Sequence, residues 1–439
     1  MSERGGRADL ARERDDLRWM RLALKAARLG RGSTHPNPRV GAVAVRAGRC
    51  LGVGSHFACG ERHAEAALLA AAGPGALEGA TVYVTLEPCA HEGRTPPCAP
   101  ALVDARIGRL VAAIGDPHPL VSGRGLAILR GAGIPVETGV CAAPAAALNA
   151  PFLWRLRGGR PLVTLKIAAS LDGRQAAQDR SSQWISSEAS RLRVHQWRAA
   201  ADAMLTGLGT LTDDLPRLTA RPGRDPLARL RRAAAAGCPP PAWPRQPARV
   251  VADSRARSGS DDRLLEHLAG SPGGRWIVAC GARAPREAIA RLSGRGVEVW
   301  VLPEGHGGSG VDLAALADRL AERGFLEVMA ECGPTLSNAL LRERLVGRVR
   351  LVVAPLLLGG EWTWTREIGV GTLPEGLRLG PLRVTRAGPD LLVEAWESRV
   401  EACLEEAASA ARGEAAGRSG DAESGARVTL AGGEACSPA

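Results

Sequence analysis

Aromatic residues are scarce in this 439-residue chain, at 3% of the sequence. One tyrosine and three phenylalanines accompany ten tryptophans, so the chain offers few surfaces on which bases of single-stranded nucleic acid could stack. Lysine is rarer still, because Lys25 and Lys166 are the only two. The formal net charge of +11 therefore comes almost entirely from arginine. Such a charge suggests nucleic acid or phosphorylated ligands, but a compositional bias is the simpler explanation, and we predict no nucleic-acid partner.

Long apolar runs and a secretory leader are also missing. No stretch of 18 or more apolar residues occurs, so no membrane-spanning helix is expected. The first 16 residues are charged and lack an apolar core, which does not fit a signal peptide. The ten cysteines are too few for a disulfide scaffold, and most are isolated among apolar neighbours. We expect a cytoplasmic protein without a membrane partner.

Two short motifs in the first half carry the chemistry of a metal site. His63-Ala64-Glu65 begins a predicted helix, and Cys89 and Cys98 follow a predicted strand at 81–86. One imidazole and two thiols are a plausible ligand set for a catalytic zinc, which keeps its fourth position for water. Glu65 is then placed to move protons, a combination typical of zinc nucleobase deaminases. Cys98 also falls at a predicted helix start, where the dipole is expected to lower the pKa of its thiol.

Two simpler explanations of the cysteines remain open at this point. They could be plainly buried, or they could hold a structural zinc, which would want a fourth protein ligand, with His91 the nearest candidate. Their separation favours a more particular site. Common zinc deaminases place two residues between their cysteines, whereas eight residues separate Cys89 from Cys98. The longer insert adds polar groups beside the metal, as a phosphorylated or unusually polar substrate would require.

Helical and extended patterns alternate along the first half. Periodicity and turn residues predict helices at 15–29, 62–72 and 124–134 and strands at 40–45, 50–54, 81–86, 109–115 and 135–140. This alternation is typical of a three-layer α/β sandwich. Asn37 lies between two prolines, which makes it either a rigidly presented amide or a simple turn residue.

A second α/β domain with its own core follows. The patterns predict helices at 187–201, 312–323 and 335–345 and strands at 161–169, 203–209, 249–253, 275–280, 297–302, 326–331 and 348–354. The turn from Glu331 to Leu336 joins a strand to a helix, and its N–H groups could hold a phosphate. No Gly-x-Gly-x-x-Gly with an acid about 20 residues on directly ends a predicted strand and opens a predicted helix, which argues against a Rossmann dinucleotide site.

Two segments lack a regular pattern. Residues 222–248 are rich in Arg, Pro and Ala without periodicity, and we interpret them as a mobile insertion. Residues 399–439 consist mainly of Ala, Gly, Glu and Ser, and we interpret them as a disordered tail.

The motifs in both halves resemble one enzyme family. In the first half, the zinc motif with its wide cysteine spacing resembles that of the bifunctional deaminase–reductases of riboflavin biosynthesis. In the second half, five segments are similar to the reductase part of the same family: Lys166–Arg174, Ser182–Ile185, Thr210–Arg221, Ala330–Leu341 and Ala354–Gly360. Two departures are Leu356, where the family often has lysine, and Arg180, where glycine is common. The resemblance implies a cytidine-deaminase-like three-layer α/β/α domain at 15–150 and a dihydrofolate-reductase-like α/β domain at 160–398.

The resemblance also implies roles for individual residues. Zinc, one ion per chain, is bound by His63, Cys89 and Cys98, with Glu65 as the catalytic acid–base. The substrate of the deaminase is contacted by Asn37, His56, His91 and Arg94. The cofactor NADPH is contacted by Ala168, Trp184, Thr210, Asp214, Ser254, Gly333, Pro334 and Thr335. The substrate of the reductase is contacted by Ser182, Arg198, Leu218, Arg221 and Glu331.

Two successive reactions are therefore expected. Zinc lowers the pKa of its bound water, and the resulting hydroxide deaminates 2,5-diamino-6-(5-phosphoribosylamino)pyrimidin-4(3H)-one with Glu65 moving the protons. NADPH then reduces the ribosyl group to give 5-amino-6-(5-phosphoribitylamino)uracil. The alternatives are a nucleic-acid or nucleotide zinc deaminase with a non-catalytic second domain, and a non-enzymatic zinc-binding module. The oligomeric state stays open, a homo-oligomer being one option.

Overall fold

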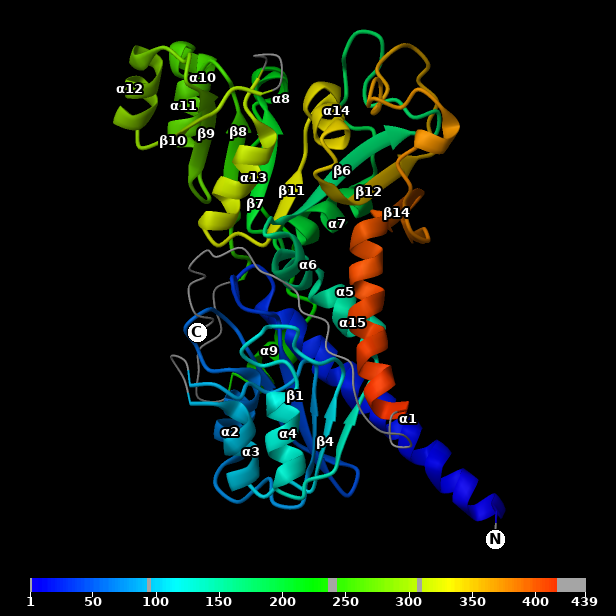
Figure 1. The fold of residues 1–439 in the computed structure, drawn as a ribbon. Coiled ribbons are helices and arrows are strands. Elements are labelled where there is room, and N and C mark those ends of the chain that lie inside the picture. The colour runs from blue at the N-terminus through cyan, green and yellow to red at the C-terminus, as the bar shows by residue number, and fades with distance from the viewer. Residues whose placement is uncertain (1, 93–95, 236–242, 306–309, 417–439) are drawn as a thin grey trace. The chain divides into compact units, whose positions relative to one another are not determined.

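The computed structural model describes residues 2–92, 96–235, 243–305 and 310–416 of the chain (Figure 1). Within this part the chain forms two compact units. The first combines 2–156 with 225–235 and 402–416, and the second combines 157–224 with 243–305 and 310–401. No helix in the described part of the chain is both long enough and apolar enough to cross a membrane.

A five-stranded mixed sheet forms the centre of the first unit. Its elements are α1 (Ser2–Ala27), η1 (Arg28–Gly30), β1 (Gly41–Arg46), β2 (Arg49–Ser55), α2 (Ala64–Ala72), β3 (Thr81–Val84), α3 (Cys98–Asp104), β4 (Arg109–Ala112), α4 (Arg124–Gly131), β5 (Val136–Thr138), α5 (Ala142–Leu148), α6 (Ala150–Gly158) and α9 (Ala228–Ala234). The strand order is β2-β1-β3-β4-β5. Strand β1 pairs antiparallel with β2 and β3, whereas β3, β4 and β5 run parallel.

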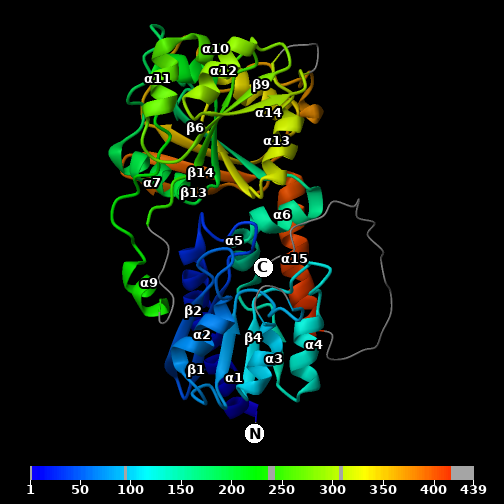
Figure 2. The same ribbon diagram turned by 90° about the vertical axis from the view of Figure 1, so that its left-hand side faces the viewer.

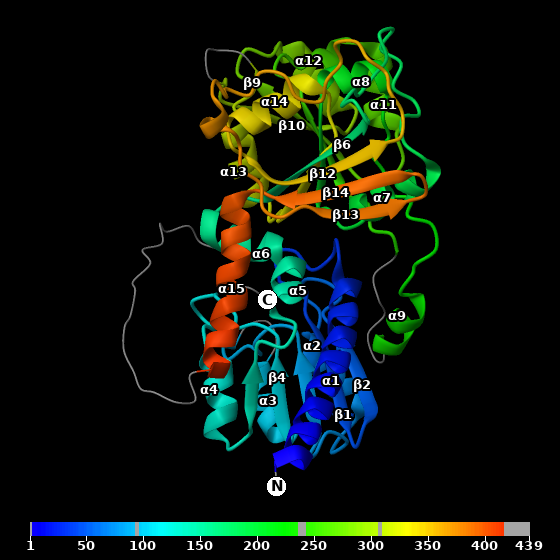
Figure 3. The same ribbon diagram turned by 90° about the vertical axis from the view of Figure 1, so that its right-hand side faces the viewer.

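Helices cover both faces of this sheet. A Cβ atom at Gly41 would meet the backbone of α1, and one at Gly54 would meet the backbone of α2. Gly54 pairs with Ala42, the residue after Gly41, and successive strand residues point to opposite faces. Figure 3 shows α1 lying along the strands. The core on the α2 face also includes buried residues of α3 and α4, such as Leu102 and Leu126. The three-layer α/β/α arrangement is confirmed.

A nine-stranded sheet organises the second unit. Its elements are β6 (Leu162–Ser170), α7 (Glu188–Arg198), β7 (Ala203–Gly207), α8 (Leu208–Asp214), β8 (Ala248–Ala252), α10 (Arg257–Ser260), α11 (Asp262–Gly270), β9 (Trp276–Gly281), α12 (Arg286–Gly294), β10 (Glu298–Leu302), α13 (Leu313–Glu322), β11 (Glu327–Ala330), α14 (Pro334–Arg342), β12 (Val346–Ala354), η3 (Leu373–Glu375), β13 (Arg383–Ala387) and β14 (Asp390–Trp396). The order is β10-β9-β8-β7-β11-β6-β12-β14-β13. The strands from β10 to β12 run parallel, and β14 pairs antiparallel with both β12 and β13 (Figures 1 and 3).

Alternating side chains of this sheet fill two cores. One core joins Leu205, Val250 and Ile277 to apolar residues of α13 and α14. The other joins Met204, Val251 and Val278 to apolar residues of α7, α11 and α12. Figure 2 shows α7 beside β13 and β14. Because neighbouring strand residues face opposite sides, this unit is also a three-layer α/β structure. The predicted α/β class of this domain is confirmed, and the antiparallel strands β13 and β14 that extend the sheet were not predicted.

The predicted disordered tail is wrong for residues 399–416. Helix α15 spans Ser398–Ala416, and its buried residues Val400, Cys403, Leu404, Ala408 and Ala411 recur at helical spacing. Alanine and glutamate are strong helix formers, so a composition that suggested disorder also suits a helix with one apolar stripe. The rest of the predicted tail, 417–439, lies outside the described residues.

The segment predicted as an aperiodic insertion, 222–248, also contains a helix. Helix α9 lies within it, and the buried Arg231 donates to Asp225 at 2.6 Å and to the Leu29 carbonyl at 3.2 Å. Part of the segment thus packs on the first unit, although an Arg- and Ala-rich stretch showed no apolar face in the sequence. Residues 236–242 lie outside the described residues, and the mobility of the segment stays a prediction.

The closeness of β2 and α2 leads to a stability prediction. A Cβ at Gly54 would lie 1.9 Å from the Ala64 carbonyl oxygen and 2.7 Å from the Leu68 nitrogen, and backbone atoms of a packed helix cannot move aside cheaply. We expect Gly54→Ala to lower the free energy of unfolding by about 1–3 kcal/mol. It should also reduce zinc content, because α2 begins next to His63. Thermal unfolding and metal analysis would measure both.

A matched control is available on α4. A Cβ at the exposed Gly131 meets no atom within 4 Å, so Gly131→Ala should leave stability unchanged or raise it by less than about 1 kcal/mol. Equal unfolding temperatures for the two variants would contradict the close packing of β2 on α2.

Candidate active sites

Three residues of the first unit form a metal-binding group. The ligand atoms of His63, Cys89 and Cys98 all lie within 4.8 Å of one another. His63 Nδ1 is 3.4 Å from Cys89 Sγ and 3.5 Å from Cys98 Sγ. One nitrogen and two sulfurs at such a separation fit zinc with a fourth position for water. The group does not include His91, so among the described residues it has no fourth protein ligand, which a structural zinc would want.

Two helix starts bring these ligands together. The sequence predicted His63 within the first turn of a helix, and the structure places it one position earlier, as the N-cap of α2. Cys98 is the first residue of α3. Cys89 follows β3 and is held to α3 by two backbone donors: the Cys98 N–H lies 3.3 Å from the Cys89 sulfur, and the Ala99 N–H lies 3.0 Å from the Cys89 carbonyl oxygen. These two bonds keep Cys89 and Cys98 close together although eight residues separate them in the sequence.

The two thiols differ in proton affinity. Cys98, then His63 and the Cys98 N–H, stabilise a thiolate on Cys89 and lower its pKa against the opposing effect of burial. The pKa of Cys98 is instead raised, first by Cys89 and then by burial. The predicted lowering at Cys98 by the helix dipole is therefore wrong, because a neighbouring thiolate and a buried environment outweigh the helix start.

Glu65 is a buried carboxyl next to this group. Burial, and then the charge of Cys89, raise its pKa to about 7, although His63 and a hydrogen bond with Cys98 act in the opposite direction. A carboxyl that titrates near neutrality can both accept and return a proton. The environment therefore gives Glu65 the property that the sequence prediction required.

Asn37 and His56 form a second buried pair beside the ligands. The Nδ1 atom of His56 faces the Arg62 carbonyl at 3.0 Å, and its Nε2 lies 3.2 Å from Asn37 Nδ2. Burial lowers the pKa of His56 to about 4, so the ring is neutral, with the proton on Nδ1 and an acceptor toward the Asn37 amide. The rings of His56 and His63 meet edge to face at 5.4 Å. Asn37 is thus a fixed amide in a site rather than a simple turn residue.

One pocket collects most of the predicted residues. Asn37, His56, His63, Glu65, Cys89 and His91 all line it. Arg94 lies outside the described residues. The sequence prediction missed the other lining residues, namely Pro38, Val40, Leu86, Glu87, Asp116, His118, Val121 and Phe152.

The missed polar residues had a usable signal. Asp116 and His118 flank Pro117 just after β4, and β4 runs parallel to β3. The carboxyl ends of parallel strands share one edge, so the loop after β4 had to lie near Cys89. The rings of His91 and His118 stack at 6.5 Å. Burial, with smaller contributions from Glu87 and Cys89, raises the pKa of Asp116 to about 7.

Glu87 holds this second loop in place. Its Oε2 accepts from the N–H groups of Asp116 at 3.2 Å and Gly123 at 3.0 Å, and its Oε1 accepts from those of Gly125 at 2.9 Å and Leu126 at 3.3 Å. One buried carboxylate thereby satisfies four backbone donors. The acid two positions before Cys89 is a positioning residue for the far wall of the pocket.

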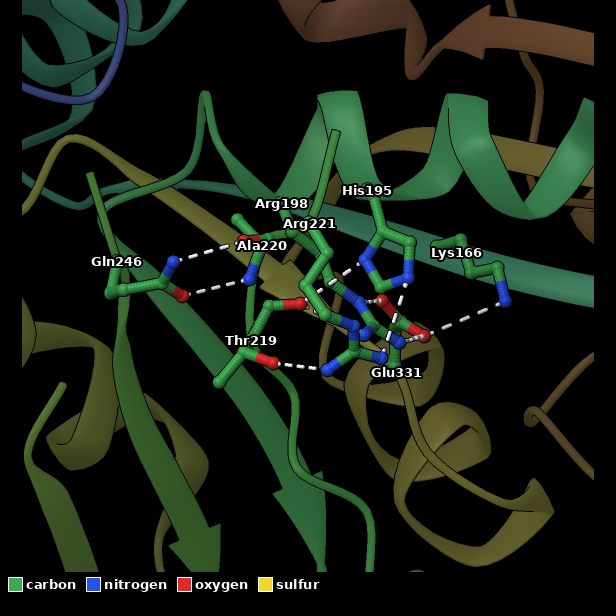
Figure 4. A network of polar contacts seen from close by, with 8 residues as sticks. All are labelled: Lys166, His195, Arg198, Thr219, Ala220, Arg221, Gln246 and Glu331. Atoms are coloured by element: carbon green, nitrogen blue, oxygen red, sulfur yellow. Dashed lines mark hydrogen bonds and ion pairs between the residues drawn. The ribbon is translucent and has the colours of Figure 1, made fainter. Parts of the chain in front are cut away.

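A network of charged side chains in the second unit contains three of the residues predicted to contact the reductase substrate (Figure 4). Arg198 at the end of α7 binds Glu331 through both carboxylate oxygens, at 2.6 and 2.8 Å. Lys166 lies 3.5 Å from the same carboxylate. Arg221 donates to Thr219 Oγ1, and the Thr219 carbonyl accepts from Arg198 at 3.2 Å. Arg198, Arg221 and Glu331 thus come together as predicted.

The charge of Glu331 is stabilised by its neighbours. Burial opposes ionisation, but Arg198 and then Lys166 outweigh it and lower the pKa of Glu331 to about 2. The other two predicted substrate residues lie outside this network. Leu218, buried and with a φ of 49°, directly precedes Thr219, and Ser182 lies in the loop between β6 and α7.

The residues predicted to bind the cofactor collect at one edge of the sheet. Ala168 lies near the carboxyl end of β6, and Thr210, Ser254 and Gly333 follow the carboxyl ends of the parallel strands β7, β8 and β11. The Gly333 N–H lies 3.1 Å from Thr210 Oγ1. Pro334 and Thr335 begin α14, whose N-terminus is favourable for anions. Ligands of open parallel sheets bind at this edge.

The remaining predicted cofactor residues lie on the surface. Trp184 is 69% exposed, with the Arg191 guanidinium 4.7 Å from its ring centroid. The exposed Asp214 ends α8, and a hydrogen bond with Gln183 links it to the residue before Trp184. Arg180, where glycine is common in the family, has a φ of 69°. That conformation favours glycine, which explains the family preference.

Comparison with known proteins agrees with both halves. Residues 13–114 match the cytidine and deoxycytidylate deaminase zinc-binding region, and residues 161–393 match the RibD C-terminal domain. The fold and the site define a zinc-dependent deaminase joined to a second α/β domain. The chain belongs to the RibD family of riboflavin biosynthesis proteins.

Full-length relatives support this membership. The chain is 40% identical to riboflavin biosynthesis protein RibD of Escherichia coli over 382 residues, which cover 86% of this chain and 98% of the relative. It is 36% identical to RibD of Aquifex aeolicus, over 86% of this chain and 97% of the relative. The structure of Acinetobacter baumannii RibD, form 1, aligns with a TM-score of 0.71 at 36% identity, over 88% of this chain and 99% of that one. A diaminohydroxyphosphoribosylaminopyrimidine deaminase/5-amino-6-(5-phosphoribosylamino)uracil reductase from Thermotoga maritima aligns with a TM-score of 0.71 at 28% identity, over 88% and 99%.

The bonds of Glu87 make a testable case for positioning. In Glu87→Gln an NH2 group must face two of the four backbone donors, so we expect a loss of about 1–3 kcal/mol in the free energy of unfolding. Deaminase activity should also fall, because the loop with Asp116 and His118 is no longer held. Thermal unfolding and ammonia release would measure the two effects. Glu92→Gln, at an exposed acid of the same stretch, serves as the control, and an equally small effect of both changes would refute the role of Glu87.

The low pKa of Glu331 predicts a pH dependence of stability. The folded value of about 2 lies below the ordinary 4.5, so the ionised carboxylate contributes stability that is complete above pH 4.5 and is lost as the pH falls toward 2. The contribution is about 3 kcal/mol at most. Urea unfolding of wild type and Glu331→Gln between pH 6 and 3 would measure it. The stability difference between them should shrink toward pH 3, and a constant difference would contradict the prediction.

Proposed function

We propose that the chain catalyses two successive steps of riboflavin biosynthesis. The first is deamination of 2,5-diamino-6-(5-phosphoribosylamino)pyrimidin-4(3H)-one. The second is reduction of the ribosyl group by NADPH to give 5-amino-6-(5-phosphoribitylamino)uracil. The observation that carries this proposal is the presence of a zinc-deaminase ligand group and a RibD C-terminal domain in one chain. The Thermotoga relative, named for both activities, aligns over nearly its whole length.

In the deaminase half, different residues bind the metal, transfer the proton and contact the substrate. His63, Cys89 and Cys98 would hold zinc, which when bound would supply the Lewis-acid chemistry that acidifies a water molecule. Glu65, with a pKa raised to about 7, takes the proton of that water and delivers it to the departing amine. The neutral His56 holds the Asn37 amide at the pocket wall, and we assign substrate contacts to Asn37, His56, His91 and Arg94.

In the reductase half the protein mainly binds and orients its ligands. NADPH supplies the hydride when bound, and the carboxyl edge of the sheet fits it because the start of α14 can accept a phosphate beside Thr210. We assign cofactor contacts to Ala168, Trp184, Thr210, Asp214, Ser254, Gly333, Pro334 and Thr335. We assign substrate contacts to Ser182, Arg198, Leu218, Arg221 and Glu331. The excess of cationic side chains around Glu331 suits the sugar phosphate.

The same proposal gives the domain limits. Residues 15–150 form the deaminase domain, and residues 160–398 form the reductase domain. The substrate is a phosphorylated pyrimidine, the cytoplasmic location and the absence of a nucleic-acid partner stay predictions, and a homo-oligomer remains one option for the assembly.

Separate assays of the two half-reactions test the proposal. Glu65→Gln keeps a side chain of the same size but cannot carry the proton, so ammonia release from the diaminopyrimidinone should fall at least about 100-fold. Zinc content should stay at one ion per chain, and NADPH oxidation with the deaminated intermediate should equal that of wild type. Ammonia assay, metal analysis and absorbance of NADPH would measure these quantities.

Two outcomes have distinct meanings. Ammonia release by Glu65→Gln at the wild-type rate would remove Glu65 from the mechanism. Wild-type protein that holds zinc but releases no ammonia from this substrate would refute the proposed deaminase reaction.

A further inference from the structure

The network at the end of α7 has more positive than negative charge. Arg198 and Lys166 contact the carboxylate of Glu331, and Arg221 joins the same network through Thr219 and His195. Burial, then Arg198 and Arg217, lower the pKa of Arg221, which indicates that neighbouring cations repel its charge. An anion arriving here would relieve that repulsion.

The two arginines differ in what they can still offer such an anion. Arg198 uses three of its N–H groups: two bind Glu331, at 2.6 and 2.8 Å, and one binds the Thr219 carbonyl at 3.2 Å. Arg221 is exposed, and both of its contacts in the network, to Thr219 Oγ1 and to His195 Nε2, are made by its terminal nitrogens. Of the two arginines, Arg221 is therefore the better placed to bind a phosphate.

His195 stands between these groups on α7, one turn before Arg198 (Figure 4). Its Nδ1 faces the Thr219 carbonyl at 3.1 Å and must donate to it, so in the neutral ring Nε2 is an acceptor. That Nε2 lies 3.5 Å from Arg221 Nη2. Burial, then Arg198 and Arg221, lower the pKa of His195 to about 4 against the weaker opposing effects of Thr219 and Glu331. The ring is thus neutral and accepts from Arg221 instead of repelling it.

The loop that carries Arg221 is held by several side chains besides His195. The Pro216 carbonyl faces His267 at 3.2 Å, and the Arg217 carbonyl accepts from Arg249 at 3.2 Å. Gln246 binds both the N–H and the carbonyl of Ala220, at 2.8 and 2.9 Å. Because other side chains hold this backbone, loss of His195 should affect the Arg221 side chain more than the loop.

We propose that His195 is a positioning residue for the reductase: it holds the Arg221 guanidinium, through its Nε2 acceptor, in the orientation that receives the phosphate monoester of the substrate. Arginine otherwise loses considerable side-chain entropy when it is ordered by a ligand. A partner that orders it beforehand removes part of that cost from binding. This inference rests on the proposed reductase function and specifies which residue prepares its phosphate contact.

Three variants of the full chain test the role of His195. His195→Leu removes both ring nitrogens, and His195→Gln keeps an acceptor near the position of Nε2. The matched control is Gln196→Leu on the same helix, where Gln196 accepts from Arg193 in an exposed contact at 3.0 Å. Each variant is assayed for NADPH oxidation with 5-amino-6-(5-phosphoribosylamino)uracil and with the same compound lacking its phosphate.

The expected result separates positioning from a merely structural role. His195→Leu should raise KM for the phosphorylated substrate about tenfold, the effect of one charge-assisted hydrogen bond. Its kcat, and its KM for the compound without phosphate, should stay within about twofold of wild type. His195→Gln should recover most of the affinity, and Gln196→Leu should match wild type. Equal KM increases for both compounds, or no increase for either, would overturn the proposal.

Binding of inorganic phosphate, followed by calorimetric titration, gives a readout that needs no turnover. Wild type should bind phosphate about ten times more tightly than His195→Leu. Equal affinities, or no binding by wild type, would overturn the role of His195 even if the enzyme oxidised NADPH. If the phosphate affinities differ but wild type oxidises no NADPH with either compound, the proposed reaction fails and the positioning role stands.

Discussion

Parallel strand pairing is the constraint on which both candidate sites depend. Strands that run parallel end at a common edge, so the residues that follow them meet although they are far apart in sequence. In the first unit this edge brings Cys89 after β3 near Asp116 after β4. In the second unit it collects Thr210, Ser254 and Gly333 after β7, β8 and β11. Helices that start at these edges add backbone N–H groups and a favourable dipole for thiolates and phosphates.

The electrostatics of the sites depend on the partners of each buried group more than on burial itself. Glu65 is buried and the side chain of Glu331 is only 12% exposed. The pKa of Glu65 is nevertheless raised to about 7, whereas that of Glu331 is lowered to about 2. The first has a thiolate beside it, and the second has Arg198 and Lys166. A general acid–base needs the first environment, and a permanently charged anchor for cationic side chains needs the second.

Much of the deaminase site could be predicted because its ligands lie in two short motifs with characteristic spacing. His63, Glu65, Cys89 and Cys98 were found from residue type and order alone, whereas Asn37, His56 and His91 were assigned only through the family resemblance. Asp116 and His118 follow a predicted strand, but they were missed because their nearness to Cys89 depends on the parallel pairing of β4 with β3, which the sequence analysis did not assign. In the second unit Lys166 and His195 belong to the network of Arg198 and Glu331 through contacts across different elements.

The sequence by itself determined the element types, the two-domain α/β class and the metal ligands, since periodicity, turn residues and motif spacing are local properties. The prediction of a disordered tail was wrong for α15, because an Ala- and Glu-rich composition is typical of helices as well as of disordered segments. Tertiary structure alone decided the proton affinities of Cys89 and Cys98, the tautomers of His56 and His195, and the engagement of Arg198 by Glu331. These properties arise from burial and from specific contacts with residues between 6 and 133 positions away in the sequence, which a residue pattern does not contain.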